Sequence, residues 1–209
     1  MKITAELRWF WRAGDVGLDQ AAGAWFAQLG PDRPALIART DLYALESNQG
    51  ELGIKMRGGN PGLELEGLVA RLAPITVGPL RGVPELWAKW TSRSLQAPAR
   101  TVSVRKTRRL RKFAWLEGRF EELPRGATGE SLAGQLPVSG CDIELTFVEV
   151  ELAREVAAFW TIGFDAFGSR GAVEPILRAA VERVAARAPD LGEPFALGYP
   201  RFLAQFALA

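Results

Sequence analysis

The sequence predicts an α+β protein in which about eight antiparallel strands close into a barrel, or tunnel, with helices packed outside. Several segments alternate between apolar and charged residues, which is the period of a β-strand. These segments follow one another with few long crossovers, which favours antiparallel neighbours. Two other segments show apolar residues at helical spacing and could cover the strands. Closing the sheet into a barrel would also remove its exposed edges.

The first predicted strand, residues 2–12, has two unlike faces. Its apolar face carries Ile3, Ala5, Leu7, Trp9 and Trp11. Its polar face carries Lys2, Thr4, Glu6, Arg8 and Arg12. If helices cover the apolar face from outside, the charged face lines the interior of the barrel. A charged interior is suited to binding a charged ligand.

The later elements are predicted in chain order from their periodicity and their turn residues. They are a helix at 18–29, a strand at 35–45, a hairpin of 51–58 with 63–72, a short helix around 85–90, two strands within 100–122, a loop at 127–140, a strand pair at 141–151 and 156–167, and a helix at 171–188. The apolar tail at 195–208 is expected to pack back onto the body. No linker demands a second domain, so we predict one barrel domain over 1–209 whose C-terminal helical segment begins near 170.

The composition excludes several classes of site. The chain has 209 residues, a formal net charge of +2 and no histidine, which rules out a Ser-His-Asp triad and every His-ligated metal site. Any metal must therefore be held by oxygen, as Mg²⁺, Mn²⁺ and Ca²⁺ are. The single cysteine, Cys141, is expected to be a structural thiol.

The sequence also gives an expectation for location. The N-terminal residues lack the apolar stretch of a signal peptide, and no segment has the length of about 20 apolar residues that spans a bilayer. We expect a cytoplasmic protein with no membrane partner.

Basic and acidic residues recur on the polar faces of the predicted strands. The basic candidates are Arg8, Arg39, Lys55, Arg57, Lys106 and Arg108. The acidic candidates are Glu6, Glu64, Glu66, Glu144 and Asp165. Arginine can bind two phosphate oxygens at once, lysine supplies a compact charge, and carboxylates could hold a divalent ion. The alternative is an open antiparallel sheet whose charged face is simply exposed to water.

The densest basic cluster, residues 105–112, allows another interpretation. Lysines and arginines in such a cluster can neutralise nucleic-acid phosphates without any motif. We regard a phosphorylated small molecule or inorganic polyphosphate as the better expectation, because the overall charge is nearly balanced.

Several short motifs, in this order, resemble the CYTH or triphosphate tunnel superfamily. The family opens with an ExExK strand, and residues 4–8 (Thr-Ala-Glu-Leu-Arg) keep the second glutamate and a base, with Thr4 replacing the first glutamate. Residues 39–43 and 53–57 resemble the next family motifs, and residues 104–108 resemble a later basic strand. Where the family has a strand ending in lysine, residues 63–66 (Leu-Glu-Leu-Glu) stand instead. Glu144 and Asp165 match the late acidic positions.

The resemblance implies a barrel with a charged tunnel. Family members include inorganic triphosphatases, thiamine triphosphatases and a class of adenylate cyclases that use Mg²⁺ or Mn²⁺. It implies that the six basic candidates contact phosphate, and that Glu6, Glu144 and Asp165 hold the metal during hydrolysis of a terminal phosphoanhydride. A non-catalytic protein that binds the anion without turnover is the alternative, because Thr4 replaces a family carboxylate.

Overall fold

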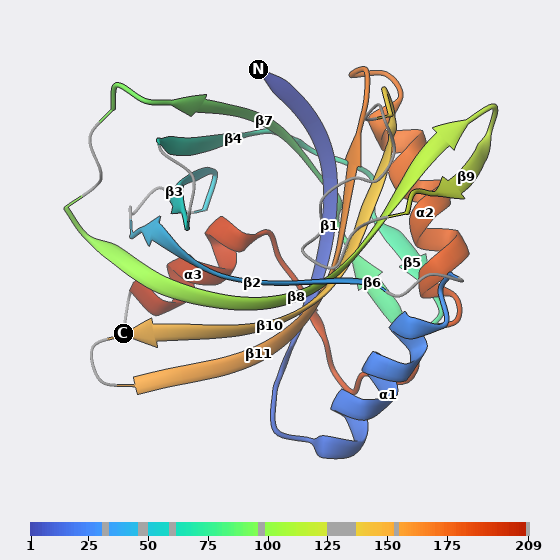
Figure 1. Ribbon diagram of the computed structural model, residues 1–209, viewed down its shortest axis with the longest axis horizontal. Helices are drawn as coiled ribbons and strands as arrows, with labels where there is room; N and C mark the ends of the chain where they lie inside the picture. The colour runs from blue at the N-terminus through green and yellow to red at the C-terminus, as the bar shows by residue number, and fades with distance from the viewer. Residues whose placement is uncertain are drawn as a thin grey trace.

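Eight antiparallel strands close into a barrel within the described part of the chain (Figure 1). The computed structural model describes residues 1–30, 34–45, 50–58, 62–95, 99–124, 137–152 and 155–207. The strands of the barrel are β1 (Lys2–Arg12), β2 (Ala35–Ala44), β3 (Leu52–Arg57), β4 (Leu63–Arg71), β7 (Glu85–Ser92), β8 (Thr101–Leu116), β10 (Gly140–Leu152) and β11 (Glu155–Phe167). This architecture confirms the predicted fold class.

The order of strands around the barrel is not a simple meander. The neighbours run β10-β11-β1-β7-β4-β3-β2-β8, and pairing of β8 with β10 closes the ring. The hairpin predicted from 51–58 and 63–72 is confirmed, with Lys55 of β3 opposite Glu64 of β4. The first strand joins two parts of the ring that are distant in sequence, because β1 lies between β7 and β11.

One predicted helix is wrong. Residues 85–90 belong to strand β7, which pairs with β4 on one side and with β1 on the other. The segment alternates in the way a strand requires, with Glu85, Trp87 and Lys89 on one face. Nearby prolines suggested a short isolated element, but long-range pairing on both sides fixes the extended conformation.

The outer face of the barrel is covered by helices, as predicted. Helix α1 (Val16–Ala27) and helix α2 (Val173–Ala185) occupy the segments expected to be helical at 18–29 and 171–188. Side chains of β1 such as Trp9 share one buried cluster with Phe26 of α1 and Ile176 of α2. The buried Cys141 belongs to the same cluster, and burial raises the pKa of its thiol.

A third helix packs against the interior-facing side chains at one end of the barrel. The tail runs through β12 (Phe195–Ala196), which pairs with β1, into α3 (Tyr199–Ala207). Phe202 of α3 is fully buried and stacks on Phe10 of β1, with ring centroids 4.1 Å apart. Interior-facing residues such as Val104 and Val150 complete this second core. The expected packing of the tail is thus confirmed, and apolar side chains fill this end.

The remaining elements lie outside the ring of strands. They are the small hairpin of β5 (Ile75–Val77) with β6 (Leu80–Gly82), and β9 (Arg119–Glu122), which pairs with the end of β8. Most of the turn predicted at 58–62 and of the loop predicted at 127–140 lies outside the described residues. None of the described helices has the length and apolar character needed to cross a bilayer.

Candidate functional site

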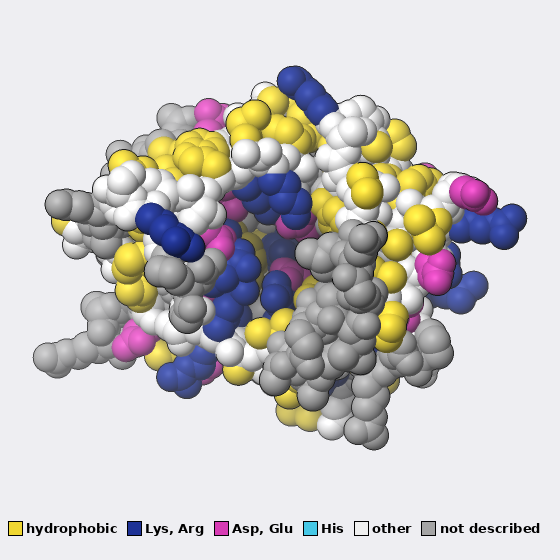
Figure 2. Space-filling view, turned by 45° about the horizontal axis from the view of Figure 1, so that its top comes forward, with side chains coloured by type: hydrophobic (Ala, Val, Ile, Leu, Met, Phe, Trp, Pro, Cys, Tyr) yellow, Lys and Arg dark blue, Asp and Glu magenta, His cyan; other side chains and the backbone are white. Residues whose placement is uncertain are grey.

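The charged faces of the strands converge on one cavity in the barrel. Its volume is about 90 Å³, and every strand of the barrel places at least one side chain on it. The space-filling view shows this hollow, with basic and acidic side chains on its wall (Figure 2). All nine residues predicted for the site line this cavity: Glu6, Arg8, Arg39, Lys55, Arg57, Lys106, Arg108, Glu144 and Asp165. Their roles toward phosphate or metal stay predictions.

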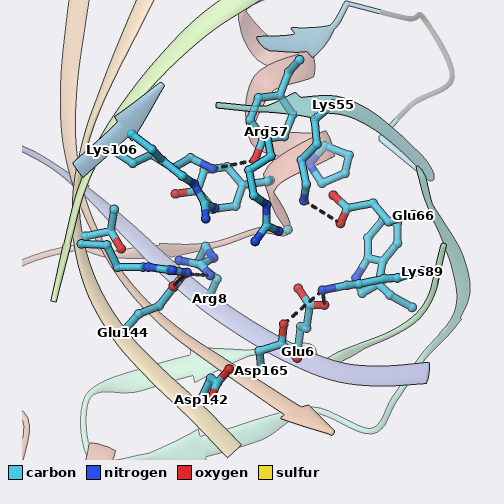
Figure 3. A pocket seen from close by; sticks show the side chains of 18 residues that line it. Glu6, Arg8, Lys55, Arg57, Glu66, Lys89, Lys106, Asp142, Glu144 and Asp165 are labelled. Atoms are coloured by element: carbon cyan, nitrogen blue, oxygen red, sulfur yellow. Dashed lines mark hydrogen bonds and ion pairs between the residues drawn. The ribbon is translucent and has the colours of Figure 1, made fainter. Parts of the chain in front are cut away.

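Glu144 of β10 lies between two arginines. Its carboxylate forms an ion pair with Arg8 of β1, and its second oxygen is 3.0 Å from Nη1 of Arg108. Burial alone would raise the pKa of Glu144, but the two arginines hold that pKa well below its usual range. The arginines are thereby fixed in direction, and both remain on the cavity wall. Figure 3 shows Arg8 beside Glu144.

A second cluster surrounds the fully buried Asp41. Its carboxylate is 3.1 Å from Nε of Arg39 and 3.2 Å from Nζ of Lys106. Lys106 also donates a hydrogen bond of 2.6 Å to the hydroxyl of Tyr43, and its ammonium lies 3.9 Å from the ring centroid of Tyr199. Burial tends to raise the pKa of Asp41, but Lys106 and Arg39 lower that pKa overall.

The β3–β4 hairpin contributes a third set of ion pairs. Nζ of Lys55 is 3.1 Å from Glu66, and Nη2 of Arg57 is 2.7 Å from Glu64. Burial opposes ionisation of Glu66, yet Lys55 and Lys89 lower its pKa to about 2. Arg57 is the more exposed of the two basic residues, with 36% of its side chain accessible. The hairpin therefore supplies two cations, each paired with a glutamate of β4. The resemblance leads one to expect a lysine at the end of this strand, and the two glutamates stand there instead.

The sequence analysis did not identify Lys89, a further basic residue of the cavity that lies next to a glutamate of β4. Lys89 of β7 lies opposite Glu66 in the β4–β7 pairing and lines the cavity. It forms ion pairs with Glu6 and, at 3.1 Å, with Asp165. The error about β7 concealed it, although the alternation of Glu85, Trp87 and Lys89 was the signal that could have revealed it. Asp142 and Tyr199 are further lining residues that were missed.

The three acids predicted as metal ligands lie in two separate groups. Glu144 is held by two arginines, whereas Glu6 and Asp165 both contact Lys89. In the described ranges, no group of three or more acidic, histidine or cysteine side chains is placed to hold a metal ion. The residues present therefore do not fit the divalent ion that the resemblance implies, because the three acids are not grouped around one point and each forms an ion pair with a basic side chain of the chain itself.

The basic cluster at 105–112 does not form one exposed patch. Lys106 and Arg108 point into the cavity, and the exposed Arg105 lies on the other face of β8. Arg111 is buried, where its guanidinium pairs with Glu122 and donates to the backbone carbonyls of Phe26 and Ala27 at the end of α1. The charges of this cluster thus serve several different sites.

Similarity to known proteins is confined to solved structures. No family model and no curated protein matches the chain. Among solved structures, the chain is similar to an adenylyl cyclase candidate from Hippeastrum that is described as having a dominant triphosphatase activity. The TM-score is 0.33, the identity is 11%, and the match covers 89% of each chain. By its own closed antiparallel barrel with a charged interior, the chain resembles the CYTH or triphosphate tunnel superfamily in fold.

Proposed function

We propose that the barrel cavity binds a small molecule that contains a polyphosphate chain, or inorganic polyphosphate itself. The observation that carries this proposal is the convergence of basic side chains from five strands on one cavity. They are Arg8, Arg39, Lys55, Arg57, Lys89, Lys106 and Arg108. Five acidic side chains share the described lining, so basic side chains outnumber acidic ones on the cavity surface. A multiply charged anion with several oxygens is the ligand that such a wall suits.

The ion pairs of the cavity explain how so many cations can lie together before a ligand arrives. Unpaired charges in a partly buried site would cost several kcal/mol each. Carboxylates such as Glu144 and Glu66 offset this cost and hold the basic groups in position. A polyphosphate that enters can then accept hydrogen bonds from groups that need little reorganisation. Arg57, one of the more accessible cations, is suited to the first contact.

The proposal covers binding, with hydrolysis as a possible extension that the experiment tests. Hydrolysis of a terminal phosphoanhydride could use the arginines to stabilise developing charge. It would also need an activated water, and the acids implied for a metal are engaged with Lys89, Arg8 and Arg108. Non-catalytic binding therefore accords better with these contacts.

Titration calorimetry with tripolyphosphate tests the proposal. We expect saturable binding at one site per chain, and Arg39→Gln should weaken it roughly tenfold or more, since a charged hydrogen bond is lost. The control is Arg105→Gln, because Arg105 is exposed on the opposite face of β8. Absence of saturable binding, or equal losses in both variants, would contradict the proposal. Phosphate release from the same ligand with Mg²⁺ or Mn²⁺ would extend the function to hydrolysis.

The same variants separate this function from nucleic-acid binding. Binding of an oligonucleotide that is lost in Arg105→Gln and kept in Arg39→Gln would point to the outer face of β8. Such binding should also weaken steeply with salt. For tripolyphosphate we expect the opposite pattern, in which Arg39→Gln weakens binding and Arg105→Gln leaves it unchanged.

A further inference from the structure

We propose that Lys89 supplies, as a fixed side-chain cation, the charge that a divalent ion would otherwise bring to this barrel, so that polyphosphate binding is independent of metal. This inference rests on the proposed function of the cavity. It concerns Glu6 and Asp165, the two neighbouring carboxylates that were expected to hold a metal.

The geometry places Lys89 between these two carboxylates. Glu6 of β1 and Asp165 of β11 are direct partners in the strand pairing, so their side chains stand side by side on the interior face. Nζ of Lys89, from β7 on the other side of β1, pairs with Glu6 and lies 3.1 Å from Oδ2 of Asp165. In Figure 3, dashed lines join the ammonium group of Lys89 to both carboxylates.

The carboxylates need a cation at this point. Burial and the neighbouring charges of Asp165 and Glu66 raise the pKa of Glu6, while Lys89 lowers it. Burial would lower the pKa of Lys89, but Asp165, Glu6 and Glu66 together hold it well above the ordinary value. Lys89 lies within ion-pair distance of both carboxylates, so the acidic pair has a counter-ion that the chain itself supplies.

The other side chains at or beside the positions implied for a metal also have partners within the chain. Thr4 stands where the first family glutamate would be, and its hydroxyl donates a 2.7 Å hydrogen bond to Glu6. Glu144 is held by Arg8 and Arg108. Asp142, the partner of Asp165 in the next strand pair, forms an ion pair with Lys112. Each of these carboxylates thus has a basic or hydroxyl partner from the chain itself.

A lysine differs from a divalent ion in what it can do for the ligand. An ammonium group carries one charge and donates three hydrogen bonds, so it can offset one of the two carboxylate charges, bond to both acids and still contact a phosphate oxygen. It cannot lower the pKa of a bound water as a metal does. The substitution of lysine for metal therefore preserves anion binding and removes one route to hydrolysis.

Direct titration with Mn²⁺, followed by electron paramagnetic resonance, tests the inference without any phosphate. We expect no saturable Mn²⁺ site in the natural protein and one site in Lys89→Met, where Glu6 and Asp165 lose their shared partner. Lys55→Met is the matched control, because it removes a lysine of the same wall whose closest partner is Glu66, a residue that keeps Lys89 nearby. It should gain no site.

Saturable Mn²⁺ binding by the natural protein would overturn the inference, and this outcome does not depend on any variant folding. If Lys89→Met folds, as judged by circular dichroism, and gains no more Mn²⁺ binding than Lys55→Met, the inference also fails.

Calorimetry with tripolyphosphate provides the second measurement. In the natural protein, the affinity with a chelator present should lie within about twofold of that with Mn²⁺. In Lys89→Met we expect it to fall roughly tenfold or more in chelator and to recover with Mn²⁺, since two carboxylates would otherwise face the anion. Loss of binding by the natural protein in chelator alone overturns the inference and leaves the proposed function intact. If the natural protein does not bind tripolyphosphate either in chelator or with Mn²⁺, while Lys89→Met gains an Mn²⁺ site, the proposed function is refuted instead.

Discussion

Arg8 and Glu144 form an ion pair although their strands are not neighbours in the sheet. Strand β11 lies between them, and Gly163 is the residue of β11 that pairs with both. A methyl group at this position would collide with the guanidinium of Arg8. The absence of a side chain at Gly163 therefore lets Arg8 lie across β11 and reach Glu144.

Gly163→Ala should weaken anion binding by displacing Arg8. We expect the affinity for tripolyphosphate to fall by about tenfold, because the arginine loses its fixed direction and Glu144 keeps only Arg108. Calorimetry gives the affinity, and denaturant unfolding gives the stability. The matched control is Gly67→Ala in β4, where an added methyl group meets no atom within 4 Å. Equal affinities for the two variants would show that the position of Arg8 is unimportant.

Glu66 should make the stability of the protein depend on acid pH. Burial would raise the pKa of this carboxyl, but Lys55 and Lys89 lower it to about 2, against an ordinary value of 4.5. The unfolded chain therefore binds this proton first, and the free energy of unfolding falls as the pH drops from about 4.5 toward 2. The contribution is on the order of 3 kcal/mol at neutral pH.

The variant Glu66→Gln removes this part of the acid sensitivity. Denaturant unfolding between pH 5 and pH 2.5 should show a shallower fall than in the natural protein. Glu121→Gln, on an exposed residue of β9, serves as the control and should follow the natural curve. If the curves of all three proteins are parallel, the ion pairs of Glu66 contribute nothing measurable.

Lys106 should make anion binding sensitive to alkaline pH. Burial lowers the pKa of Lys106 well below that of an ordinary lysine; Asp41 opposes this, and Lys55 and Arg39 reinforce it. As the pH rises through the lowered pKa, the cavity loses one positive charge, so the affinity for tripolyphosphate should fall. The fall should begin well below pH 10, near which free lysines titrate.

Affinities measured from pH 6 to pH 9.5 check this expectation. Lys106→Arg keeps its charge throughout this range and should remove the alkaline fall, whereas Lys106→Met should bind weakly at every pH. A natural protein whose affinity stays constant to pH 9.5 would refute the role of Lys106.

Phe202 should be the main anchor of α3. Its side chain is fully buried and contacts the rings of Phe10, Phe159 and Phe206, with centroids 4.1 to 5.2 Å away. Phe202→Ala should therefore lower the free energy of unfolding by about 3–5 kcal/mol. Gln205→Ala, on the exposed side of the same helix, should change it by less than about 0.5 kcal/mol. Denaturant unfolding compares the two, and similar losses would mean that α3 contributes little to the core.

Much of the fold could be predicted because alternation in the strands is strong and local. The two faces of β1 differ so clearly that the sequence indicates which one meets the helices, and the structure buries Trp9 with α1 and α2. The predicted basic residues reach one cavity for the same reason. Strand β7 was missed because its conformation depends on pairing with β1 and β4, which are distant in sequence.

The contacts between residues could not be predicted in the same way. The partner of Lys89 is set by the order of strands around the barrel, which differs from their order in the sequence. The role of Gly163 depends on which arginine lies across it, and strand composition does not reveal this. The resemblance predicted which types of residue line the site. The partners of Glu144 could be identified only from the order of strands in the closed barrel.

Because the apolar side chains of α3 occupy one end of the barrel interior, the charged cavity behaves as a cup. A linear polymer could then insert a terminus but could not be threaded through. Molecules that share the same terminal phosphates should compete for the cup with similar strength, whatever group extends from the mouth.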